Sequence, residues 1–265
     1  MNASLESVLQ PFVLRETRDG IATLTLNRPN RLNALSTEMI AALTAELDAI
    51  AVDSTVRVVV LAASGNAFCA GHDLKEMRAH IDETWQRSLF DACTQMMLKL
   101  TQLPQPVIAR VQGAAAAAGC QLVSMCDLAV AADSVKFGLS GINAGIACST
   151  PAVGVVRNIS RKRAMELLLT GGMIDATTAL DWGLVNRVVP SAALDTTVAQ
   201  LATTIAGKSR AAMALAKRAF YEQVELGLDA AYVVAGSAMA CNMIDPDAAE
   251  GVDAFLGKRA PVWHA

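Results

Sequence analysis

Residues 106–131 read PVIARVQGAAAAAGCQLVSMCDLAVA and decide the fold class. The apolar run 106–111 follows Pro104, which ends a preceding helix, and it predicts a strand. A helix is expected over about 118–126, and residues 127–131 are again typical of a strand. A strand, a helix and a strand in this order indicate an α/β protein built in layers.

The segments before this stretch repeat the alternation of strand and helix. Two strands joined by the turn pair Asp19-Gly20 predict a hairpin. Ser36 or Thr37 can cap a helix whose apolar residues recur at helical spacing. The expected strands are 12–16, 21–26 and 56–62, and a further helix is expected over 82–103.

The last third of the chain, from Ser160, is predicted to be almost entirely helical. From Ser160 onward, Ser160 and Asp175 are suitable N-caps, and only residues 185–189 are predicted as extended. We therefore divide the chain into a core, 1–195, and a C-terminal helical segment, 196–265.

The composition leaves ample material for a hydrophobic core. Of the 265 residues, 53% are apolar and 18% are charged, so disorder is not expected. The net charge is -3, and apart from residues 161–163 the basic residues are scattered, which excludes a nucleic-acid partner. The longest apolar runs, such as 113–125, fall short of the roughly 20 residues that span a bilayer, so no membrane partner is expected. The expected partner is therefore a small molecule.

The N-terminus and the cysteines bear on cellular location. No basic residue precedes Arg15, and Glu6 is acidic, which suits neither a secretory signal nor a transit peptide. A cytoplasmic protein is therefore expected. The six cysteines form no CxxC pair and lie among apolar or small residues, which predicts reduced, buried thiols and no metal site.

Four groups of short motifs, in this order and spacing, resemble the crotonase superfamily of enoyl-CoA hydratases and isomerases. The resemblance covers nearly the whole chain and implies a spiral of ββα turns followed by a helical trimerisation segment. Such proteins assemble as a homotrimer or a dimer of trimers and need no cofactor beyond the coenzyme A of their ligand. The motifs are LNRP at 26–29 with LNAL at 32–35; AFCAGHDL at 67–74; PVIA at 106–109 with Gly113, Gly119-Cys120 and Cys126-Asp127; and Thr170-Gly171 with Ala176, Ala179 and GLV at 183–185.

By this resemblance the backbone amides of His72 and Ala118 form an oxyanion hole for the carbonyl of an acyl-CoA thioester. Two fixed N–H donors aimed at that oxygen stabilise the negative charge that develops on it. The small residues 114–119 would let the thioester approach the backbone, and the helix start adds a positive dipole end. The alternative is that 114–118 is a tightly packed turn and helix start.

The two glutamates that hydratases of this superfamily use are replaced, by the same resemblance, with Gln121 and Gly141. Neither residue can exchange a proton at neutral pH, so ordinary hydratase activity is not expected. Gln121 either hydrogen-bonds a water or a substrate hydroxyl, or packs and caps within the helix start. Two hypotheses follow: an enzyme that transfers protons by another group, or a noncatalytic acyl-CoA-binding or assembly protein.

The side chain of His72 is the one obvious proton-transfer group near the thioester, because imidazole titrates near neutrality. Our interpretation is that it points away, since a side chain and its amide leave the backbone in different directions. Asp73 and Glu76 are expected to orient this loop or cap its helix. Ser149 lies near the nucleophile of the superfamily's dehalogenases but lacks a base. The polar residues expected near the pocket are Ser140, Asn143, Cys148, Ser149 and Thr150.

The coenzyme A contacts are also implied by the resemblance. Backbone groups of Ala70, Asp73 and Leu74 correspond to the adenine-binding segment. Phe255 and Lys258 match a C-terminal pair that often comes from the neighbouring subunit, and Lys258 would offer a point charge to a phosphate. Its alternative is an ordinary solvated lysine near a helix end. Segments 114–121, 146–151 and 258–263 resemble one subgroup, the enoyl-CoA hydratase domain-containing protein 3 type, which shares the missing acids.

Overall fold

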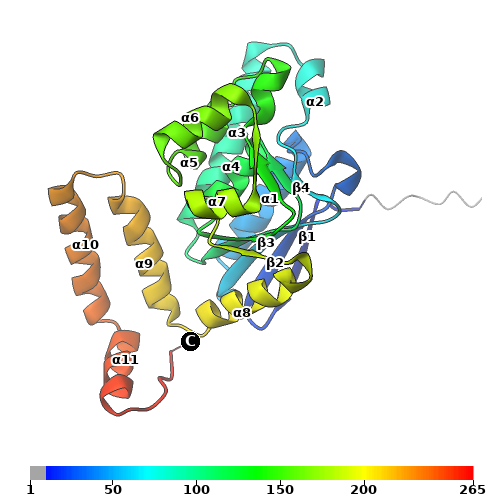
Figure 1. Ribbon diagram of the computed structural model, residues 1–265. Coiled ribbons are helices and arrows are strands. Elements are labelled where there is room, and N and C mark those ends of the chain that lie inside the picture. The colour runs from blue at the N-terminus through cyan, green and yellow to red at the C-terminus, as the bar shows by residue number, and fades with distance from the viewer. Residues whose placement is uncertain (1–9, 265) are drawn as a thin grey trace, which may run out of the picture.

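A computed structural model describes residues 10–264, and its strands form two sheets (Figure 1). The strands are β1 Val13–Arg18, β2 Ile21–Leu26, β3 Val58–Ala63, β4 Ala67–Cys69, β5 Val107–Val111, β6 Ala114–Ala116, β7 Leu128–Ala132, β8 Lys136–Gly138, β9 Met173–Asp175 and β10 Arg187–Val189. The larger sheet has the order β1-β2-β3-β5-β7-β10, and the smaller has the order β4-β6-β8-β9. The hairpin β1–β2 and the pair β8–β9 are antiparallel, and the other pairs are parallel.

The helices complete a spiral in which each turn adds one strand to each sheet. The turns run β3, β4, α2 and α3, then β5, β6 and α4, then β7, β8 and α5 (Figure 1). This arrangement confirms the α/β spiral of ββα turns. The helices are α1 Thr37–Ala51, α2 Leu74–Ala79, α3 Glu83–Gln102, α4 Ala118–Met125, α5 Ser149–Val155, α6 Arg161–Thr170, α7 Ala176–Trp182, α8 Leu194–Ala206, α9 Arg210–Gln223, α10 Leu228–Met243 and α11 Pro246–Leu256.

The core forms where the sequence is most regularly apolar. Every residue of β3 is buried, as expected for a central strand of a parallel sheet that is covered on both faces. The helix α1 begins at the predicted cap, since the hydroxyl of Ser36 accepts from the amide of Met39 at 3.3 Å. Its buried residues are those that the helical spacing predicted: Met39, Ile40, Leu43, Leu47 and Ile50.

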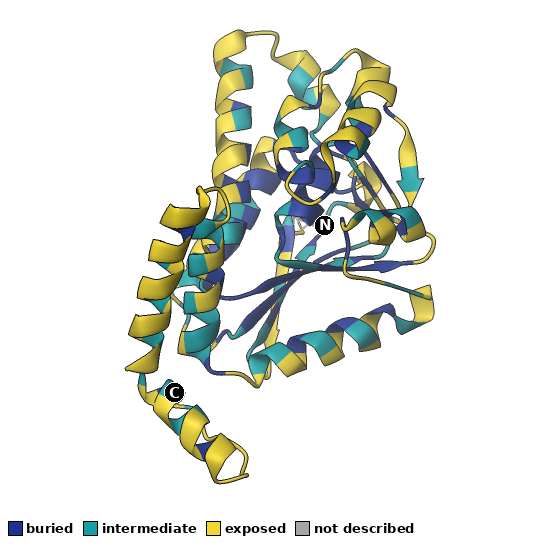
Figure 2. Ribbon diagram, turned by 60° about the vertical axis from the view of Figure 1, so that its left-hand side comes forward, coloured by how far each residue is buried: buried dark blue, intermediate teal, exposed yellow. Residues whose placement is uncertain are grey.

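The last part of the chain leaves the body of the molecule. The helix α8 packs against β3, β5 and β7, whereas α9, α10 and α11 extend away from the sheets (Figure 1). Figure 2 shows mostly exposed residues along these outer helices. The division expected after residue 195 stays a prediction, and α8 spans it. Large apolar side chains on the outer helices are exposed, among them Phe220, Tyr232, Val233, Ile244 and Phe255.

A buried ion pair fastens α9 to the core. The ammonium of Lys217 lies 2.7 Å from a carboxylate oxygen of Asp127, and it also donates to the carbonyls of Leu100 and Gln105. The other oxygen of Asp127 accepts from the hydroxyl of Tyr221 at 3.0 Å. Burial lowers the pKa of Lys217 despite the neighbouring carboxylate. These contacts join α9 to the core segments that carry Leu100, Gln105 and Asp127.

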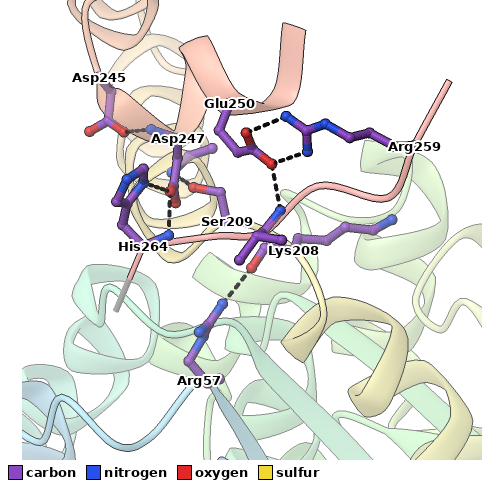
Figure 3. A network of polar contacts seen from close by, with 10 residues as sticks. Arg57, Lys208, Ser209, Asp245, Asp247, Glu250, Arg259 and His264 are labelled. Carbon is purple, nitrogen blue, oxygen red and sulfur yellow. Dashed lines mark hydrogen bonds and ion pairs between the residues drawn. The ribbon is translucent and has the colours of Figure 1, made fainter. Parts of the chain in front are cut away.

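The C-terminal tail, residues 258–264, folds back on α11 (Figure 3). The guanidinium of Arg259 donates to both carboxylate oxygens of Glu250, at 2.6 and 2.8 Å, and these bonds hold the pKa of Glu250 down to about 2. The amide of His264 donates to Asp247 at 2.7 Å. The indole of Trp263 donates to the carbonyl of Gly207 at 2.9 Å, which ties the tail to the segment before α9.

Three details of the sequence-based description need correction. The three-residue strands β4, β6 and β9 were not expected, and β9 shows that residues 185–189 are not the one extended segment after Ser160. Cys241 is exposed, although the other five cysteines are buried. The expectation drawn from the N-terminus falls largely on residues 1–9, which lie outside the described residues. Among the described helices, none is long and apolar enough to cross a membrane.

Candidate functional site

Two loops of the smaller sheet meet at one point. Because β4 and β6 run parallel as neighbours, the residues that follow them lie side by side. Gly71 has a φ of +100°, and a Cβ atom there would lie 3.0 Å from the Cβ of Ala117 and 3.4 Å from the amide nitrogen of Ala118. The loop that carries His72 therefore touches the first residue of α4.

Ala117 is the N-cap of α4 and has a φ of 48°, a backbone conformation that residues with a Cβ rarely adopt. Strain of this kind persists only where the surroundings fix it, and here the amide of Ala117 donates to the carbonyl of Gly138 at 2.8 Å. Within residues 10–264, neither the amide of His72 nor that of Ala118 donates a hydrogen bond. The site thus holds two adjacent N–H donors that the chain leaves unused.

A cavity of about 390 Å³ opens next to these amides. Its wall is mainly apolar, and among the described residues no aspartate or glutamate contributes to it. The cavity is lined by Ala70, His72, Leu74, Met77, Gln86, Phe90, Ala117, Ala118, Ser140, Gly141, Ala144, Ile146, Ala147, Cys148, Ser149, Thr150 and Pro151.

Most of the residues expected at the site line this cavity, but Gln121, Asp73 and Asn143 do not, and neither do the C-terminal residues Phe255 and Lys258. Gln121 is buried in α4 outside the lining, and its Oε1 has no hydrogen-bond partner within the described chain. Asp73 caps α2 by accepting from the amides of Lys75 and Glu76, as expected for a residue that orients this loop. Asn143 instead donates to the carbonyl of Gly171 at 3.0 Å, away from the cavity.

Gly141 lines the cavity, but no space for a side chain exists there. A Cβ atom on this residue would lie 2.6 Å from the Sγ of Cys148 and 2.9 Å from the carbonyl oxygen of Ile146. Real Cβ atoms essentially never come that close to another heavy atom. The place that a glutamate side chain would enter is therefore filled by the loop before α5.

The side chain of His72 does not point away, which corrects our interpretation from the sequence. Its ring lines the cavity and meets the ring of Phe90 edge to face, with centroids 5.3 Å apart. Burial lowers the pKa of His72 to about 4, so the imidazole is neutral at pH 7 and does not titrate near neutrality. Its Nε2 is buried without a partner among the described residues.

The lowered pKa of His72 predicts a dependence of stability on pH. The unfolded imidazole has a pKa of about 6.5, so between pH 6.5 and 4 the unfolded state binds more protons than the folded state. The stabilisation is therefore complete above pH 6.5 and is lost as the pH falls toward 4. Urea denaturation should show that the wild type loses about 1–3 kcal/mol more than His72→Gln across this window. Parallel pH profiles of the two proteins would contradict the buried, neutral imidazole.

The expected C-terminal coenzyme A residues lie away from this cavity within one chain. Phe255 is 82% exposed near the end of α11, and Lys258 is an exposed residue at the start of the tail, with a φ of 51°. Neither residue contributes to the lining. If they serve this site, they do so from another copy of the chain.

Sequence reasoning missed one wall of the cavity. Met77 from α2 and Gln86 and Phe90 from α3 form part of the lining. The side-chain Nε2 of Gln86 donates to the carbonyls of Met77 and His80, and these bonds hold α2 against α3. No motif marks these residues, and only the predicted helix over 82–103 could have suggested that one of its faces meets the site.

The comparisons with known proteins all point to the same family. The family model described as enoyl-CoA hydratase/isomerase matches residues 16–265. The enoyl-CoA hydratase domain-containing protein 3, mitochondrial, of Rattus norvegicus is 41% identical over 93% of this chain and 82% of its own length. A crystal structure of an enoyl-CoA hydratase from Mycobacterium smegmatis is 54% identical, covers 97% of this chain and 100% of its own, and has a TM-score of 0.95. The human domain-containing protein 3 structure is 40% identical, covers 96% and 100%, and has a TM-score of 0.93.

These names correct the cellular location expected from the sequence. The relatives from rat, mouse, human and Xenopus laevis are all named mitochondrial proteins, which overturns the cytoplasmic location. The resemblance to the domain-containing protein 3 subgroup is confirmed by the same names.

Proposed function

Because this chain belongs to the enoyl-CoA hydratase/isomerase family, we propose that it binds an acyl-CoA thioester in the cavity beside His72 and Ala118 without ordinary hydratase activity. One observation carries the proposal: two unused backbone amides meet at a cavity whose described wall contains no carboxylate. The amides suit a carbonyl oxygen, and the absence of acids leaves hydration without its proton carriers.

The two amides support binding of a thioester carbonyl for geometric reasons. They come from adjacent loops that are fixed by β4, β6 and the strained Ala117, so little reorganisation is needed to receive the oxygen. Ala118 is the first residue of an eight-residue helix, whose dipole adds positive potential at the same place. Developing negative charge on the oxygen would therefore be stabilised.

The rest of the cavity argues against acid-base hydration. The side chain of Gln121 cannot transfer a proton at neutral pH, and the space beside Gly141 is closed by Cys148. The imidazole of His72 is neutral, because burial lowers its pKa to about 4. These features also favour the alternative, a noncatalytic acyl-CoA-binding or assembly protein, over an enzyme that transfers protons by another route.

The exposed apolar helices support self-association into a homotrimer or a dimer of trimers. Phe220 on α9 and Tyr232 on α10 are 53% and 72% exposed, and such surface is normally covered in solution. By the family resemblance, Phe255 and Lys258 of a second copy would then serve the cavity. Sedimentation at micromolar concentration should give a trimer or hexamer, and a stable monomer would contradict this assembly.

Calorimetry with acetyl-CoA and octanoyl-CoA tests the proposal. We expect saturable binding of both, weakened by Lys258→Ala and weakened further by Ala118→Pro. Proline at 118 removes one amide donor at the first helical position, where its ring is tolerated best. Lys162→Ala, on the exposed start of α6, is the matched control for Lys258→Ala. If neither thioester binds, the ligand assignment is wrong.

A further inference from the structure

Two neighbouring parts of the cavity wall are held in different ways. Three main-chain hydrogen bonds of 2.8–3.2 Å join residues 70–73, which include His72, to residues 32–35. The short helix α2 follows directly, contributes Leu74 and Met77 to the wall, and contains no buried residue. The loop with the proposed amide donor is therefore fixed by its backbone, whereas α2 depends on side chains for its attachment.

The first turn of α2 is attached on its N-terminal side. Asp73 caps the helix by accepting from the amides of Lys75 and Glu76. The carboxylate of Glu76 accepts from the amide of Thr37 at 3.0 Å and from the hydroxyl of the same residue, at the start of α1. The beginning of α2 is thus tied to the loop before it and to α1.

The end of α2 is attached through the first turns of α3. The Nε2 of Gln86 donates to the carbonyls of Met77 and His80 at 2.8 and 2.7 Å. Carbonyls at the C-terminal end of a helix lack amide partners from a further turn, so a side chain that donates to them stabilises this end. The ring of His80 also stacks on that of Trp85, with centroids 4.2 Å apart. Ile81, in the turn that follows, is 82% exposed.

We infer that residues 77–82 form a gate at the cavity and that Gln86 is the positioning residue that holds this gate shut. The inference rests on the proposed function, because the gate then controls how fast an acyl-CoA enters and leaves. Segments with few buried apolar contacts open locally at low free energy. When the gate opens, Met77 leaves the wall, while the amide of His72 stays in place because its loop is bonded to residues 32–35.

A gate held in this way acts on rates more than on affinity. It is shut both in the free protein and around a bound ligand, so the two hydrogen bonds of Gln86 stabilise both of these states. Their loss favours the open state, through which both entry and exit pass. Removal of the donor should therefore raise the association and dissociation rate constants together, by about tenfold, and leave Kd within about twofold.

Stopped-flow measurements with the full-length protein and octanoyl-CoA test the inference. Gln86→Met keeps most of the side-chain volume but has no donor, so it should show the faster association and dissociation. Gln86→Lys supplies an ammonium that donates to the same carbonyls, and it should restore slow exchange of the ligand. Gln95→Met is the matched control, because Gln95 is exposed on the same helix and lies outside the cavity lining. Its rate constants should equal those of the wild type.

Hydrogen exchange of the ligand-free protein tests the attachment itself. In Gln86→Met, the amides of residues 77–80 should exchange about tenfold faster than in the wild type. Those of residues 70–73 should be unchanged, because their loop keeps its main-chain bonds. This comparison needs no ligand, so it remains decisive even if no thioester binds.

Three results would overturn the inference. Unchanged hydrogen exchange at residues 77–80 in Gln86→Met would show that Gln86 does not hold this segment. Unchanged rate constants for octanoyl-CoA would show that the segment is no gate. Faster dissociation with unchanged association would mean that Gln86, which lines the cavity, contacts the ligand instead. In the last two cases octanoyl-CoA still binds and the proposed function stands, whereas failure of every thioester to bind refutes the proposed function itself.

Discussion

Crotonyl-CoA should be hydrated by this protein at least about 10⁴-fold more slowly than by a family member that carries both glutamates. Each general acid or base contributes about 10² to 10⁴ in rate, and the cavity wall offers neither among its described residues. The assay follows the loss of absorbance of the conjugated double bond, with a two-glutamate relative measured beside it. A rate that matches that relative would show that another group in this protein moves the proton.

Restoring the two glutamates should not restore the rate. In Gln121→Glu with Gly141→Glu, the new side chain at 141 would have to displace Cys148, and the carbonyl of Ile146 blocks the same space. We therefore expect a less stable protein that remains slow. Rapid hydration by this double variant would mean that the loop before α5 yields easily.

Replacing Lys217 by alanine should lower the free energy of unfolding by about 3–5 kcal/mol. The substitution leaves the half-buried carboxylate of Asp127 without its cation, and it removes the donor from the carbonyls of Leu100 and Gln105. Removing one member of a buried ion pair costs far more than the pair itself contributes. Urea denaturation at one fixed protein concentration measures the change, because self-association would also affect stability.

Lys162→Ala is the control for this effect. Lys162 is exposed on α6, and a surface substitution there should change stability by no more than about 0.5 kcal/mol. Equal losses in the two variants, or a loss below about 1 kcal/mol for Lys217→Ala, would contradict the role assigned to the ion pair.

Much of the fold could be predicted because local signals agree with the tertiary structure. The hairpin turn at Asp19-Gly20, the cap at Ser36 and the cap of α7 at Asp175 all occur where the sequence indicates. The strands β4, β6 and β9 of the smaller sheet were missed because each spans three residues, too few to show a period. Residues 114–116, all alanine, form a strand because β4 and β8 pair with them.

The candidate site was likewise predictable only in part. The resemblance pointed to His72 and Ala118, whose loops the structure brings together, and to Gly141, which lines the cavity. The orientation of the His72 ring depends on Phe90, which is remote in sequence. The ion pair of Asp127 and Lys217 also joins distant segments, and a lysine on a predicted helix gives no sign that it will be buried.

The carbonyl stretch of bound ligand tests the central claim most directly. Infrared difference spectra of butyryl-CoA labelled with ¹³C at the thioester carbonyl report the polarisation of that bond. If the amides of His72 and Ala118 hold the oxygen, binding to the wild type should shift the stretch to lower frequency, and the shift should shrink in Ala118→Pro. Saturable binding with the stretch left at its free frequency would contradict the oxyanion hole.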